Sequence, residues 1–174
     1  MRKLTSITFI YHVKEDRVLA AINAGHADAW SCWLTRRLVL AWLERAGEFV
    51  ASTSALAQRA PASFRGEFVA FEREAAIATT AKAMTKTPDD VLKSSATTAE
   101  LADRVTISNQ QDSFRLDLLG ESGAGAAGVL TRAEMQRVLQ MLQTVVAKAG
   151  WLAEPTKSPV PSAAAAPDPK PFRN

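Results

Sequence analysis

The stretches DAWSCWLTR at residues 28–36 and AGAAGVLTR at residues 124–132 share the triplet Leu-Thr-Arg, and they decide the interpretation of the chain. The triplets are offset by 130 − 34 = 96 residues. The same offset relates Asp16, in an upstream polar turn, to Asp112, in a second polar turn. An apolar run lies on each side of both turns, and a helical pattern begins after each triplet. The repetition predicts two copies of one βββα unit, over about residues 5–50 and 103–150.

Alternating apolar residues predict the strands of each unit. Residues 7–11 and 17–23 flank the polar turn at 14–16 as a hairpin, and residues 30–34 form a third strand. Residues 105–109, 114–119 and 126–130 repeat this order, with a turn at 110–112.

Three helices are expected. The segment LVLAWL at 38–43 is apolar around its whole circumference, so the helix over 35–50 is predicted to be buried on several sides. Thr131 and Glu134 match a capping box at the start of the last helix, which Gly150 ends.

A third helix is predicted over 64–84. Residues 85–104 are polar and contain Pro88, so they are predicted to form a mobile connection with at most one short helical turn.

The fold class that follows is α+β. We expect an antiparallel β-sheet or sandwich built from two pseudo-repeated βββα units, with a helical pair between them in an insert over 51–102 and a C-terminal helix. Residues 1–152 are predicted to form a single domain. Residues 153–174 are rich in Pro and Ala and are predicted to be a disordered tail, either a frayed end or a segment that docks on a partner.

This order of elements is similar to the head domain of the end-joining and centriolar-cartwheel scaffold superfamily, in which a helix-turn-helix interrupts a β-sandwich and a helix follows. The resemblance lies in element order and in no sequence motif. It implies a scaffold role that depends on a long dimerising helix. This chain departs from the pattern because its last helix ends at Gly150.

Composition restricts the class of protein. Hydrophobic residues make up 47% and charged residues 22%, and the longest apolar stretch, at 38–43, is far too short to span a bilayer. We expect no secretory signal, and the single cysteine fits a reducing compartment, so a soluble cytoplasmic protein is predicted. The net charge of +3 is not gathered into a basic tract, so nucleic acid is the less favoured partner.

One stretch imitates a nucleotide site. Residues 120–127 (GESGAGAA) resemble a phosphate-binding loop, but Ala126 and Ala127 stand where lysine and a serine or threonine are required. Residues 123–128 formally match GxGxxG, yet Lys148 stands about where the ribose-binding acid belongs. The sequence therefore predicts a hairpin loop and no cofactor.

Other reactive residue types are isolated. His12 and His26 lack the further ligands that a metal site needs. Cys32 alternates with Trp30 and Leu34, which predicts a buried, inert thiol. No catalytic, cofactor-binding or metal-binding residue is predicted.

The candidate interface residues are aromatic. Phe64, Phe68 and Phe71 recur at alternating four and three spacing, which is typical either of internal packing or of a self-association seam. Core packing is the favoured interpretation of Trp30, Trp33 and Trp42, but the odd spacing of the first two directs their indoles to opposite faces of a strand. Trp33 is therefore the fourth candidate, as an interface anchor if it is exposed.

These patterns favour a non-catalytic protein–protein interaction or assembly module that self-associates, with a dimer as the favoured homo-oligomer. A nucleic-acid-binding accessory protein is the alternative. An enzyme whose residues converge from distant positions is the third reading.

Overall fold

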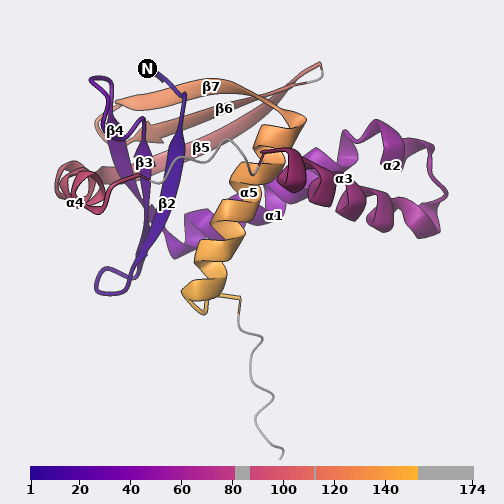
Figure 1. Ribbon diagram of the computed structural model, residues 1–174, viewed down its shortest axis with the longest axis horizontal. Coiled ribbons are helices and arrows are strands. Elements are labelled where there is room, and N and C mark those ends of the chain that lie inside the picture. Colours follow the sequence, from indigo (N-terminus) through magenta and orange to yellow (C-terminus); the bar gives the residue numbers. More distant parts are fainter. Residues whose placement is uncertain (81–86, 112, 153–174) are drawn as a thin grey trace, which may run out of the picture.

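A seven-stranded sheet with helices on both of its faces forms the body of the protein (Figure 1). The computed structural model describes residues 1–80, 87–111 and 113–152. The strands are β1 (Arg2–Lys3), β2 (Ile7–His12), β3 (Arg17–Ile22), β4 (Trp30–Thr35), β5 (Glu100–Gln110), β6 (Ser113–Gly120) and β7 (Gly125–Thr131). The protein is therefore α+β, as the sequence predicts.

The sheet is mixed, so the expectation of a purely antiparallel sheet is wrong. Its strand order is β1-β7-β6-β5-β4-β3-β2. The strands β2-β3-β4 and β5-β6-β7 form two antiparallel meanders, whereas the pairs β4–β5 and β1–β7 are parallel. The β4–β5 pair is parallel because helices intervene between the two strands, so the chain re-enters the sheet in the same direction.

The two ends of the strand order are joined by the chain itself. β1 and β2 lie at opposite ends of the order, yet only residues 4–6 separate them. The Leu4 amide donates to the Ala127 carbonyl at 2.7 Å, and the Asn23 amide donates to the Ser6 carbonyl at 3.1 Å. The short strand β1, which alternation along the sequence did not predict, therefore covers part of the β7 edge.

Two long helices close the core against the inner face of the sheet. They are α1 (Arg36–Ser52) and α5 (Arg132–Lys148). Threonine caps both: the Leu38 amide donates to Thr35 Oγ1, and Thr131 forms the predicted capping box with Glu134. The largest fully buried side chains come from the sheet and from both helices; among them are Leu19, Ile22, Leu34, Phe114, Leu116, Leu118, Met135, Leu139 and Leu142.

The segment between the meanders is more helical than the sequence indicates. It contains α2 (Ala55–Arg59), a 3-10 turn η1 (Ala62–Phe64), α3 (Arg65–Thr80) and α4 (Asp89–Thr98). The predicted mobile connection over 85–104 is wrong from Asp89 onward, because α4 is ten residues long and β5 begins at Glu100. Pro88 precedes α4, and two aspartates in its first turn favour a helix start. The prediction missed this signal because the segment as a whole is polar and lacks sustained apolar periodicity. Part of the predicted helix over 64–84 lies outside the described residues.

The 96-residue offset recurs in the geometry of the two meanders. Both α1 and α5 have 17 residues and begin 132 − 36 = 96 residues apart. β3 and β4 pair Arg17 with Thr35, and β6 and β7 pair Ser113 with Thr131, each residue shifted by 96. The first hairpins differ, because His12 pairs with Arg17 whereas Gln110 pairs with Ser113. That the units are copies of one another stays a prediction.

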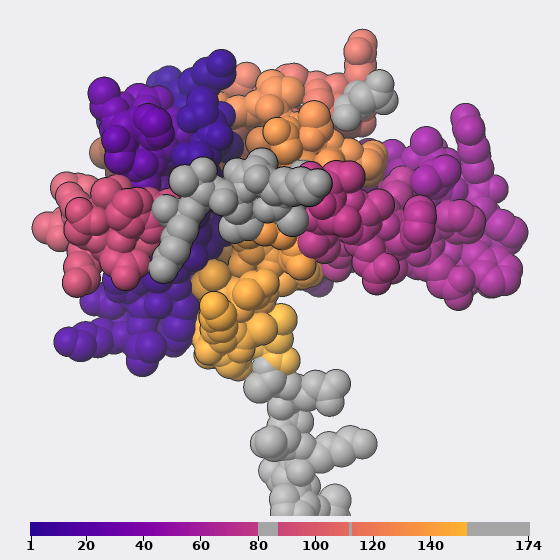
Figure 2. Space-filling model, viewed as in Figure 1, coloured from indigo at the N-terminus to yellow at the C-terminus, as the bar shows by residue number. Residues whose placement is uncertain are grey.

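The elements α2, η1 and α3 extend to one side of the body, and we call residues 55–80 the arm (Figure 2). α3 packs against α5 and α2, whereas α4 covers β3 and β4 on the outer face of the sheet. No helix within the described ranges is long and apolar enough to cross a bilayer. The predicted tail at 153–174 and the Asp112 turn position lie outside those ranges.

Candidate protein-interaction surface

Three of the four predicted interface residues lie together on the arm. Phe64 ends η1, and Phe68 and Phe71 follow on α3. Their exposed fractions are 49%, 40% and 65%, and Leu56 on α2 is 47% exposed. Large apolar side chains on a monomer surface are normal singly, but several on one protruding element mark a surface for association. We call Phe64, Phe68 and Phe71 the phenylalanine stripe.

The arm presents the stripe because its other face is used internally. Ala76 of α3 is buried, and Val69, Glu72 and Ile77 on the same side are half-buried. This side of α3 packs against α5, since a helix directs residues three and four apart to one face. The stripe therefore points away from the body that supports it.

A buried cap fixes the start of the arm. Ser54 is fully buried and its hydroxyl oxygen accepts a hydrogen bond from the Ala57 amide at 3.0 Å. The serine oxygen thus satisfies one of the backbone amides that have no partner within the first turn of α2.

Arg132 ties the base of the arm to the body. Its guanidinium donates to the Val50 carbonyl at 2.8 Å and to the Thr53 carbonyl at 2.7 Å, at the end of α1. The same group lies 5.2 Å from the centroid of the Phe114 ring. Sequence reasoning missed this positioning role, because the contact spans about 80 residues and leaves no local pattern.

Two acidic residues accompany the stripe. Glu67 and Glu74 are exposed, and they lie four residues before and three residues after Phe71, so they share its face of α3. Arg65, also exposed, lies three residues before Phe68, so the border of the stripe carries both signs and is negative beside Phe71.

Trp33, the fourth candidate, lies elsewhere. It is half-buried on the outer face of β4, whereas Trp30 is buried on the inner face, as their spacing predicts. The Trp33 ring meets the His12 ring edge to face, with centroids 4.9 Å apart. The structure therefore does not bring Trp33 together with the phenylalanine stripe.

An apolar groove runs between α1 and the free edge of β5. β4 pairs only with Glu100 and Leu101, so β5 beyond Leu101 has β6 on one side and no strand on the other among the described residues. The groove has a volume of about 340 Å³. It is lined by Leu38, Ala41, Trp42, Arg45, Ala46, Phe49, Val105, Thr106 and Ile107.

Trp42, which lines the groove, extends from it into the core. It is 5% exposed, and its ring meets the Phe9 ring of β2 edge to face. Its Nε1 is buried and has no hydrogen-bond partner within the described part of the chain, which is an exception to the usual pairing of buried donors.

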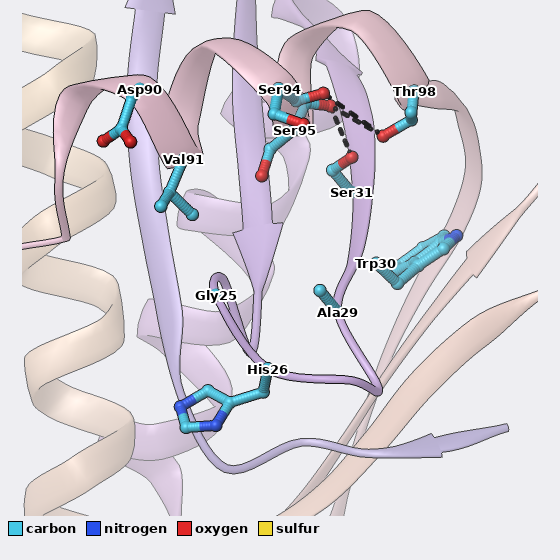
Figure 3. A pocket seen from close by; sticks show the side chains of 10 residues that line it. All are labelled: Gly25, His26, Ala29, Trp30, Ser31, Asp90, Val91, Ser94, Ser95 and Thr98. Carbon is cyan, nitrogen blue, oxygen red and sulfur yellow. Dashed lines mark hydrogen bonds between the residues drawn. The ribbon is translucent and has the colours of Figure 1, made fainter.

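A second, polar pocket of about 390 Å³ lies between α4 and the β3–β4 loop (Figure 3). It gathers His26, Asp90 and Ser94, the residue types of a catalytic triad, but they are not arranged as one. His26 lies at the opposite end of the pocket from Ser94, and its ring points away from the serine (Figure 3). The nearby hydroxyls serve the backbone: Ser31 Oγ donates to the Ser95 carbonyl at 2.6 Å.

The residues that imitate a nucleotide or redox site are placed as the sequence predicts. Gly125 begins strand β7, so a strand follows the glycine-rich loop where a phosphate-binding loop requires a helix. Cys32 is fully buried, and burial together with the charge of Glu100 raises the pKa of the thiol to about 12. The thiol is therefore neutral at physiological pH. The described residues contain no group of three or more His, Cys, Asp or Glu side chains placed to hold a metal ion.

The chain has no significant match among protein-family models, curated proteins or solved structures. None of these comparisons supports the similarity of the expected element order to the scaffold head domains.

Proposed function

We propose that this protein is a non-catalytic assembly module that self-associates through the arm. The observation that supports the proposal is the phenylalanine stripe, which exposes three large aromatic side chains on an element that extends from the body. Aromatic side chains dominate the energetics of many interfaces, because each removes a large apolar area from water.

Internal duplication belongs to the same proposal. Shared helix lengths, caps and strand register at the 96-residue offset support a chain built from two βββα copies. In this view the arm is an insertion that only one copy carries. The single buried cysteine is compatible with a cytoplasmic location, which stays a prediction.

The test is molar mass by light scattering on the full chain over a range of concentrations and at two salt levels. We expect the wild type to be a dimer, and Phe68→Glu and Phe71→Glu to shift it to monomer, because each places a charge inside an apolar contact. Val13→Glu is the matched control, since Val13 is 77% exposed in the first hairpin turn, away from the arm. A wild type that stays monomeric at all concentrations refutes self-association.

Nucleic-acid binding is the second candidate, and one observation favours it. On the outer face of the first meander, Trp33 and His12 lie beside Arg17, which pairs with His12 across the β2–β3 ladder. A partly exposed indole near the cation of Arg17 can stack on a base. The discriminating measurement is retention on single-stranded nucleic acid as salt rises: binding that weakens with salt and is lost in Trp33→Ala supports this candidate.

A further inference from the structure

We propose that the groove between α1 and β5 is the receptor for the phenylalanine stripe of a second copy of this chain. The inference rests on the proposed self-association and names the surface that the arm contacts. In a two-fold dimer each arm enters the groove of its partner, so the contact is made twice and closes the assembly.

The two surfaces match in charge. Arg45 is the charged residue among the described residues that line the groove, and it is exposed. Glu67 and Glu74, also exposed, flank Phe71 on α3. When Phe71 enters the groove, Arg45 has a carboxylate on the incoming helix as a partner.

Charge disfavours one form of the simplest alternative, in which the stripes of two copies pack against each other. A parallel, in-register pair of α3 helices sets Glu67 and Glu74 each beside its own equivalent, and like charges across such a seam are repulsive. An antiparallel pair that sets Phe68 against Phe71 of the other copy places Glu74 against Arg65, which is attractive. The cross-linking experiment below distinguishes that antiparallel pair from the groove.

The groove also lacks what an arm would supply. Leu38, Phe49 and Ile107 line it and remain partly exposed. The aromatic rings of an incoming stripe would cover this apolar wall.

The proposed internal duplication gives one reason why a helix would fit this position. Under the 96-residue offset, α1 corresponds to α5, and α5 already packs against α3 of its own chain. The neighbours of α1 are α5, α2, β3, β4 and β5, so the side of α1 that faces the groove carries no equivalent helix among the described elements. The α3 of a second copy would supply it with its opposite side, the phenylalanine stripe, because its Ala76 side already packs on α5 of its own chain.

Charge reversal tests the groove separately from the arm. We expect Arg45→Glu to raise the dimer dissociation constant at least about fivefold, and the triple variant with Glu67→Lys and Glu74→Lys to restore it. Arg37→Glu is the matched control, because Arg37 is exposed on the first turn of the same helix and does not line the groove. Circular dichroism checks that each variant is folded.

Cross-linking gives the direct readout. The native thiol of Cys32 is fully buried, so disulfides formed under a mild oxidant report on introduced cysteines. Phe71→Cys mixed with Arg45→Cys should give a cross-linked heterodimer, because a disulfide requires Cα atoms about 4.4–6.8 Å apart. Phe71→Cys mixed with Arg37→Cys should not.

The outcomes separate the two proposals. One set of results would overturn the groove and retain the arm: Phe68→Glu dissociates the dimer, Arg45→Glu leaves it unchanged, and Phe71→Cys cross-links only to itself. A wild type that is monomeric in light scattering overturns both. Dissociation by Arg45→Glu, rescue by the triple variant and the mixed cross-link together support the groove.

Discussion

At the scale of single residues, the buried side chain of Asn23 ties the connection between β1 and β2 to the end of β3. Asn23 is fully buried with φ at +48°, in the left-handed region. Its Oδ1 accepts hydrogen bonds from the Thr5 amide, the Thr5 hydroxyl and the Ser6 amide, and its Nδ2 donates to the Lys3 carbonyl and to Asp28. One side chain thus satisfies the backbone where β1 turns into β2.

Asn23→Ala should therefore destabilise the fold by about 3 kcal/mol, because it removes the hydrogen bonds that join the β1–β2 connection to the end of β3 and places alanine at a positive φ. Urea denaturation measures the change. Asn109→Ala is the control, since Asn109 is exposed, and it should change stability by less than about 0.5 kcal/mol. Equal effects of the two variants would contradict a structural role for Asn23.

Glu100 gives a prediction in pH. Burial acts to raise its pKa, but hydrogen bonds from Ser122 and from the Trp30 indole, with the charge of Arg2, outweigh burial and hold the pKa below its ordinary value. A lowered folded-state pKa stabilises the protein above the unfolded pKa, about 4.3, and this contribution is lost as pH falls through the folded value.

Glu100→Gln should accordingly be less stable than the wild type at pH 7, and the difference should shrink below about pH 4. Thermal melts from pH 3 to 7 measure it, with the exposed Glu121→Gln as the matched control. A difference that does not vary with pH would show that packing, and not ionisation, is what the substitution disturbs.

At the scale of elements, local signals specify helix starts well. The Thr131 amide donates to Glu134 Oε2 at 2.7 Å, and the Glu134 amide donates to Thr131 Oγ1 at 3.2 Å, as the sequence predicts. The capping box can be predicted because both partners lie within one turn.

Thr131→Ala should cost about 1 kcal/mol in the free energy of unfolding, because it removes the cap of α5. Thr144→Ala is a suitable control: Thr144 is exposed within the same helix, where alanine is a better helix former. Chemical denaturation should show a loss for the first variant and none for the second.

At the scale of the whole molecule, the described C-terminal end is fastened to the first hairpin. Trp151 is 5% exposed, its Nε1 donates to Asp16 Oδ1 at 2.9 Å, and its ring meets the Tyr11 ring edge to face at 5.5 Å. Hydrogen bonds from Trp151 and Tyr11 hold the pKa of Asp16 below its ordinary value. The contact joins residues 135 positions apart in the sequence.

Trp151→Ala should lower stability by about 3–5 kcal/mol, since it removes a buried aromatic ring and the partner of Asp16. Leu152→Ala should have an effect within about 0.5 kcal/mol, because Leu152 is 55% exposed. If thermal unfolding shows similar losses in both, this end of the chain is not held as described.

The sequence by itself determined the six longer strands, the caps of α1 and α5, the buried thiol and the strand that follows the glycine-rich loop. Each of these features depends on residues that are close together in the sequence, because alternation along a strand and capping at a helix start are local patterns. It also identified the phenylalanine stripe, but it left open whether the stripe is internal.

Only the tertiary structure decided what depends on distant partners. The exposure of Phe71 follows from the packing of the opposite side of α3 on α5, and the parallel pairs follow from where the chain re-enters the sheet. The groove beside Trp42 exists because β4 stops pairing with β5 after Leu101. A pattern of residues records which side of an element is apolar, whereas the fold determines whether another element covers it.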